Sequence, residues 1–179
     1  MNTKSRKGVL GILGGIEPVI WMLAAIIIIF SFTGEHFLSW SNALNILQQA
    51  APFLILALAE TLAVLVGQID LSVGNNMAFC TVIVALAMSA GIPVWLSVLA
   101  GLLTGTLCGL LNGIFIAKLN VPAYITTFGF GTMFYGFGSL ITGGVSIPAL
   151  DEGFRFLADG SVLGIPMVLI IAVIVFLLV

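Results

Sequence analysis

The chain has 179 residues, of which 61% are hydrophobic and only 7% carry a charge. A soluble domain carries about 25% charged residues, so this sequence cannot cover its surface with groups that face water. The scarcity of Lys and Arg argues against nucleic-acid binding, and the two cysteines form neither a disulfide framework nor a metal-binding set.

Long apolar stretches follow one another along the chain, and a membrane helix needs about 20 such residues. About six spans are predicted on this basis. They cover residues 17–33, 43–66, 72–90, 94–117, 123–141 and a stretch that begins near Leu163 and is still apolar at Val179. The expected fold class is therefore all-α: a polytopic integral membrane helical bundle that forms a single transmembrane domain over residues 1–179.

Prolines mark the beginnings of these spans. Most of them fall at or just before a first helical turn, where a missing N–H costs little: Pro18, Pro93, Pro122 and Pro166. Pro52 instead lies deep within the second predicted span. Because it removes one backbone hydrogen bond of the helix, we expect a kink there.

The distribution of basic residues predicts the orientation of the chain. Lys4, Arg6 and Lys7 precede the first predicted span, so we expect a cytoplasmic N-terminus. Alternation of the spans then places Asp70 and Lys118 at the cytoplasmic side. The longest loop, residues 142–162, falls on the opposite side together with its acidic residues.

The segment Gly67-Gln68-Ile69-Asp70-Leu71-Ser72-Val73-Gly74 sets one carboxylate in a glycine-flanked turn between two apolar runs. We expect the Ser72 hydroxyl to cap the third span by accepting an N–H from Gly74 or Asn75. Asp70 adds negative charge at the same helix N-terminus. A direct role of Asp70 and Ser72 in coupling or gating is the alternative. Both roles can hold, because a motor subunit can push on a stiff cytoplasmic turn.

This segment closely resembles the Gly-x-Ile-Asp-Leu-Ser-x-Gly signature of the permease subunits of bacterial ABC sugar importers, the ribose, xylose and galactose type. The signature positions in this chain are Gly67, Ile69, Asp70, Leu71, Ser72 and Gly74. Two further blocks, residues 109–113 and 118–127, resemble the family in the same order. Gln68, Tyr124 and Phe128 depart mildly from its usual residues.

The resemblance implies a transport subunit without catalytic activity of its own. It implies a multi-pass protein of the bacterial inner (plasma) membrane that forms the pathway for a ribose-like pentose or a hexose. The implied partners are a second permease chain, cytoplasmic ATP-binding subunits and a periplasmic sugar-binding protein. No Walker A pattern occurs in the sequence, so we expect no cofactor on this chain and ATP to act through a partner subunit.

The apolar stretch after Pro166 contains only about 14 residues, which is short for a membrane span. No basic anchor follows it, and permeases of the resembled type are nearly twice as long as this chain. We therefore expect the sequence to be the N-terminal part of a longer permease that does not couple to the ATPase by itself.

A neutral sugar offers hydroxyl groups and an apolar ring face, so polar side chains within the spans are candidates for the translocation pathway. They are Gln48, Gln49, Glu60, Asn75, Asn112 and Thr126, with Thr127 and Tyr135 as further ones. Hydrogen bonding between helices is the rival interpretation, and for Asn112 it is favoured. An ionised Glu60 would cost about 2.5–3.5 kcal/mol in lipid, so we expect this carboxyl to be protonated, paired or facing water.

Glycines recur at every fourth residue of the fourth predicted span: Gly101, Gly105, Gly109 and Gly113. They fall on one side of the helix, and in a membrane such a stripe lets another helix approach closely. Two other functions stay open. One is an ion-coupled secondary carrier or channel that uses Glu60 as its coupling acid, and the other is a membrane scaffold that transports nothing.

Overall fold

The computed structural model describes residues 18–148 and 151–179. The chain divides into two compact units, one that ends at Ile46 and one that runs from Leu47 to Val179. The basic residues that predict the orientation (Lys4, Arg6 and Lys7) lie outside the described residues, as does the first residue of the first predicted span.

The first unit contains helix α2 (Pro18–Thr33) and the beginning of helix α3 (Trp40–Leu65). A turn joins them, in which the N–H of Gly34 donates to the carbonyl of Phe30 at 2.9 Å. Helix α2 is apolar on every side, and none of its described residues is buried. A helix with this pattern is stable where lipid surrounds it.

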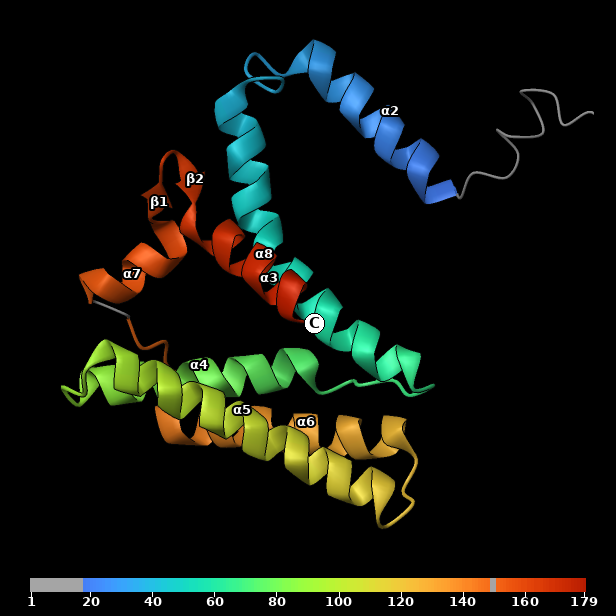
Figure 1. Ribbon diagram of the computed structural model, residues 1–179, viewed down its shortest axis with the longest axis vertical. Helices are drawn as coiled ribbons and strands as arrows, with labels where there is room; N and C mark the ends of the chain where they lie inside the picture. Colours follow the sequence, from blue (N-terminus) through green and yellow to red (C-terminus); the bar gives the residue numbers. More distant parts are fainter. Residues whose placement is uncertain (1–17, 149–150) are drawn as a thin grey trace, which may run out of the picture. The chain divides into compact units, whose positions relative to one another are not determined.

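The second unit continues α3 and adds α4 (Val73–Ser89), α5 (Val94–Ala117) and α6 (Ala123–Thr142), shown in Figure 1. Pro93 and Pro122 are the N-cap residues of α5 and α6, as the sequence predicts. Pro52 lies inside α3. The bounds of α2 to α6 agree with the predicted spans to within a few residues.

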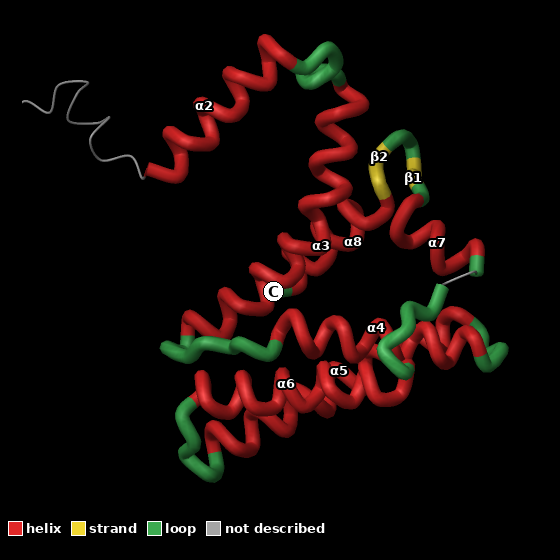
Figure 2. Tube along the Cα trace, turned by 180° about the vertical axis from the view of Figure 1, so that it is seen from behind, coloured by secondary structure: helices red, strands yellow, loops and turns green. Residues whose placement is uncertain are grey.

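The segment after α6 differs from the prediction. It contains α7 (Glu152–Asp159), a hairpin of β1 (Ser161–Val162) and β2 (Ile165–Pro166), and then α8 (Met167–Leu178). Figure 2 shows the hairpin in yellow between the two helices. The prediction that the last span begins near Leu163 is wrong, because Leu163 (φ +54°) and Gly164 (φ +80°) form the turn of the hairpin. In the part of the chain that the structure describes, this hairpin is the departure from an all-α fold.

Helices α4, α5 and α6 pack against one another and form the core of the second unit (Figures 1 and 2). The side chains that α5 buries are Ser97, Gly101, Cys108 and Asn112. Those that α6 buries are Ala123, Thr126, Thr127, Gly131, Phe134 and Gly138. Most of these residues are small and recur every three or four positions, so the helix backbones approach closely.

Helices α3 and α5 are long and apolar enough to cross a membrane, by length and composition. Three others, α2, α4 and α8, are apolar but shorter. Large apolar side chains stay exposed along all of these helices, among them Trp21, Phe53, Leu102 and Phe176. Apolar surface of this extent indicates contact with lipid or with other protein.

Candidate functional site

The turn between α3 and α4 ends one helix and begins the next within a few residues. Gly67 adopts φ +74°, a conformation that glycine reaches without steric cost. Its N–H donates to the carbonyl of Val64 at 2.9 Å, and the N–H of Gln68 donates to the carbonyl of Ala63 at 2.9 Å. These two bonds satisfy carbonyls at the end of α3 and turn the chain sharply towards Asp70.

Asp70 is the centre of this turn. One of its carboxylate oxygens, Oδ1, accepts the backbone N–H of Ser72 at 2.7 Å and the hydroxyl of Ser72 at 2.6 Å. The predicted cap is therefore wrong, because the Ser72 side chain makes no capping bond to the helix and its hydroxyl donates to Asp70. The aspartate accepts both donors of Ser72, and a charged acceptor makes such bonds short and strong.

Glu60 reaches this turn from α3. Its Oε1 accepts the backbone N–H of Asp70 at 3.2 Å, and the side chain is half-buried. The structure thus shows this carboxyl bonded to the turn that follows its own helix. This bond fixes the end of α3 to the beginning of α4.

Asn112 connects the same turn to α5. Its Nδ2 donates to the hydroxyl oxygen of Ser72 at 2.8 Å, and both side chains are buried. Asn112 is therefore hydrogen-bonded to the N-terminal end of α4. Its Oδ1 is buried without a hydrogen-bond partner among the described residues. Leaving such an oxygen unpaired costs free energy, which makes the amide a sensitive part of the packing.

Thr127 connects the turn to α6. Its hydroxyl oxygen accepts the N–H of Leu71 at 3.0 Å and donates its proton to the carbonyl of Ala123 at 2.8 Å. Thr127 is almost fully buried. Four elements, α3, α4, α5 and α6, thus converge on one hydrogen-bonded turn, which we call the Asp70 hub: Glu60, Asp70, Ser72, Asn112 and Thr127.

Replacing Thr127 with valine tests the contact with α6. Valine keeps the shape but leaves the Leu71 N–H without its acceptor, so the free energy of unfolding should fall by about 1 kcal/mol. Thr132→Val is the matched control, because the Thr132 hydroxyl is exposed and bonds only within its own helix. Reversible unfolding in mixed micelles measures both variants. Equal losses in the two would show that the Leu71 contact contributes nothing.

The other predicted pathway residues do not join the Asp70 hub. Gln48 donates to the carbonyl of Ala158 at 3.1 Å, and Gln49 is exposed. Gln48 lies twelve positions from Glu60 in α3, which separates them by roughly 18 Å along the helix axis. Thr126 is buried, with its hydroxyl unpaired among the described residues.

Two of the four glycines in the predicted stripe of α5 lie against another helix. A Cβ on Gly101 would collide with Val84, and one on Gly105 would lie 3.2 Å from Cys80 Sγ, so both glycines pack against α4. Gly109 and Gly113 are exposed, and nothing lies within 4 Å of where their Cβ atoms would be. The buried side of α5 turns away from them towards Cys108 and Asn112.

A glycine of α6, Gly131, lies directly against the backbone at the start of α4. A Cβ on Gly131 would lie 3.0 Å from Ser72 Cα and 3.3 Å from Asn75 Nδ2. Gly131 therefore allows α6 to touch the first turn of α4 beside the Asp70 hub. The sequence carries a pattern that indicates this close contact, because small residues recur four positions apart in α6: Ala123, Thr127 and Gly131.

The chemistry of the Asp70 hub is that of a structural joint. It contains two carboxyl groups, two hydroxyls and one amide, which hold one another and the backbone. Among the residues that the structure describes, no three His, Cys, Asp or Glu side chains gather as a metal site. The arrangement can transmit a displacement of the turn to four helices at once.

A comparison with models of protein families shows to which family the chain belongs. Residues 42–179 match the family described as branched-chain amino acid transport system / permease component. The chain belongs to this permease family. The matched range contains the entire Asp70 hub and all helices from α4 onwards. No solved structure gives a significant match to the chain.

Curated relatives of this permease agree with the family. The ribose import permease protein RbsC of Haemophilus influenzae is 38% identical over 161 residues, which are 86% of this chain and 49% of that protein. The galactose/methyl galactoside import permease protein MglC of Escherichia coli K12 is 34% identical over 179 residues, 90% of this chain and 52% of that protein. The autoinducer 2 import system permease protein LsrC of Salmonella typhi is 32% identical over 146 residues, 80% of this chain and 42% of that protein. The chain thus spans about half the length of the curated relatives it matches.

Proposed function

We propose that this chain is the transmembrane permease subunit of a bacterial ABC importer and forms part of the pathway for a neutral monosaccharide. The observation that carries this proposal is the family match over residues 42–179 together with relatives named as ribose and galactose import permeases. The exposed apolar helices support a location in the inner membrane. The basic residues Lys4, Arg6 and Lys7 favour a cytoplasmic N-terminus.

The proposed ABC importer contains three other kinds of subunit. A second permease chain completes the pathway, a periplasmic binding protein delivers the sugar, and cytoplasmic subunits bind ATP. Force from the ATP-binding subunits moves the cytoplasmic ends of the spans. Because the Asp70 hub joins α3, α4, α5 and α6 there, these helices move together and the pathway opens alternately to the two sides.

The description of the family also names branched-chain amino acids, so amino acid import is the second candidate. The relatives reported above favour sugar. An amino acid carries an ammonium and a carboxylate group, which a permease binds best through charged side chains or helix ends. A neutral sugar needs only hydroxyl, amide and aromatic partners, which this chain supplies.

Uptake into proteoliposomes tests the proposal. The full-length permease that carries this sequence is reconstituted with its ATP-binding subunits and its binding protein, and labelled ribose, galactose, fructose and leucine are offered in turn. ATP-dependent accumulation of one of the sugars is expected. Accumulation of leucine alone would replace the sugar with an amino acid, and the absence of any ATP-dependent uptake would overturn the proposal.

Glu60→Gln separates the ABC importer from an ion-coupled carrier. The amide oxygen of glutamine still accepts the N–H of Asp70, so the turn keeps its bond and uptake should stay within about twofold of the unaltered protein. Uptake should also persist when an uncoupler collapses the pH gradient. A carrier with Glu60 as its coupling acid would lose accumulation in both measurements.

A further inference from the structure

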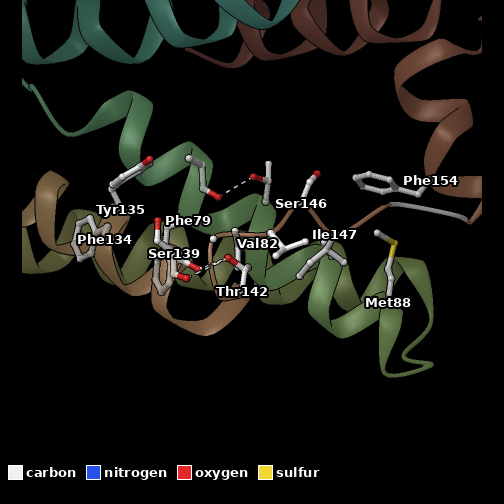
Figure 3. A pocket seen from close by; sticks show the side chains of 16 residues that line it. Phe79, Val82, Met88, Phe134, Tyr135, Ser139, Thr142, Ser146, Ile147 and Phe154 are labelled. Carbon is white, nitrogen blue, oxygen red and sulfur yellow. Dashed lines mark hydrogen bonds between the residues drawn. The ribbon is translucent and has the colours of Figure 1, made fainter.

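A cavity of about 410 Å³ lies between α4 and α6, away from the Asp70 hub. Figure 3 shows it from close by, with side chains of both helices, of residues 144–147 and of Phe154 in α7 around it. On α4 its lining extends from Ala78 to Met88, and on α6 from Phe134 to Thr142. The cavity thus opens beside the C-terminal ends of two helices that both begin at the predicted cytoplasmic face. Its volume lies within the range of about 300–1,000 Å³ that is usual for small-molecule sites.

The side chains of the cavity are uncharged and combine aromatic rings with hydroxyl groups. Phe79 and Phe134 stack with ring centroids 6.1 Å apart and planes inclined by 9°, and Phe134 is buried. Together they form a fixed apolar wall against which one face of a small ring can lie. The hydroxyl groups come from Thr81, Tyr135, Ser139, Thr142 and Ser146.

These hydroxyls differ in what they can offer. Thr81 donates its proton to the carbonyl of Ala78 at 2.8 Å and Thr142 to that of Gly138 at 3.0 Å, so both present mainly acceptor lone pairs. The hydroxyls of Ser139, Ser146 and Tyr135 make no hydrogen bond with other described residues and are free to donate or accept. The set matches a ligand whose own groups are hydroxyls.

We propose that this cavity is a binding site for a neutral monosaccharide on the outer side of the permease. The inference rests on the proposed function, which supplies the direction of transport and the delivery of sugar at that side. A zwitterionic amino acid would find no charged partner in this lining. A lipid chain would desolvate the hydroxyls without replacing their hydrogen bonds, which is unfavourable.

Removal of the free hydroxyls tests the site. Ser139→Ala and Ser146→Ala are combined in one protein, and the concentration dependence of uptake is measured in the proteoliposome system for the sugar that the unaltered permease accumulates. The double variant should raise the apparent KM for that sugar roughly tenfold and leave the maximal rate within about twofold, because each lost hydrogen bond to the ligand weakens binding. Tyr135→Phe, which removes one more hydroxyl, should raise the KM about threefold.

Ser89→Ala is the control, because Ser89 is a serine at the end of α4, a helix that borders the cavity, but does not itself line it. It should leave the KM unchanged, and ATP hydrolysis without sugar should be the same in all variants. A KM that stays unchanged in the double variant, while the unaltered permease transports sugar, would overturn the cavity site and leave the proposed function intact. Failure of the unaltered permease to transport any sugar would instead overturn the proposed function. Competition by leucine in place of the sugar would overturn both.

Discussion

Asp70→Ala should lower the free energy of unfolding by about 3 kcal/mol and abolish uptake. The substitution removes the acceptor of two donors of Ser72, whose side chain is only 1% exposed. A buried donor without a partner costs about 1–3 kcal/mol, and bonds to a charged acceptor lie at the upper end. The loss also frees the Ser72 hydroxyl to rotate, which weakens the bond from Asn112 and the contact with α5.

Reversible unfolding in mixed micelles measures this effect, and proteoliposome uptake measures its consequence. Asp159→Ala is the matched control, because Asp159 is exposed at the end of α7. Asp70→Asn keeps an oxygen at the same place and should lose only about 1 kcal/mol. If Asp70→Ala were as stable as Asp159→Ala, the Asp70 hub would not hold the helices together.

Gly131→Ala should be the second most damaging change, with a loss of about 1–3 kcal/mol. Its methyl group would lie 3.0 Å from Ser72 Cα and 3.2 Å from Ser72 Cβ, which is too close for packed carbon atoms. Because a backbone atom cannot turn aside as a long side chain can, α6 must move away from α4. The displacement would also stretch the bond between Thr127 and the Leu71 N–H.

Gly109→Ala is the matched control for this prediction. It places the same methyl group in the neighbouring helix where nothing lies within 4 Å. Since alanine favours the helix over glycine by about 1 kcal/mol, this variant should be as stable as the unaltered protein or more so. Both variants are compared by unfolding in the same micelles. A loss in Gly109→Ala equal to that in Gly131→Ala would mean that glycine acts through helix flexibility and not through close packing.

Much of the helical architecture could be predicted from the sequence, because apolar length and proline both act locally. The clearest case is α5, whose predicted range 94–117 equals the observed one. The segment after α6 could not be predicted in the same way. Helix α7 has only eight residues, and the hairpin is held by two residue pairs, so neither gives a long periodic pattern. Asp151 is a local feature that indicates the start of α7, since its side chain caps this helix by accepting the N–H of Phe154 at 3.1 Å.

The position of the turn at Asp70 could also be predicted, but its bonding partners could not. The sequence places a carboxylate and a hydroxyl two residues apart, and either can accept an N–H at a helix start. The Ser72 hydroxyl instead donates to Asp70 and accepts from Asn112, which is 40 residues away. The contact of Thr127 with Leu71 spans 56 residues in the same way. Such bonds are set by how the helices pack, which local patterns do not encode.

Chemical labelling of the two ends of the helices tests the central claim, that the Asp70 hub and the sugar cavity face opposite sides of the membrane. Cys80 and Cys108 are replaced by alanine, and Gln68→Cys or Ser161→Cys adds one exposed thiol. A maleimide that does not cross membranes is then applied to cells before and after the inner membrane is opened. The account predicts that the thiol at position 161 reacts in closed cells, whereas the thiol at position 68 reacts only after opening. Reaction of both thiols from the same side would contradict it.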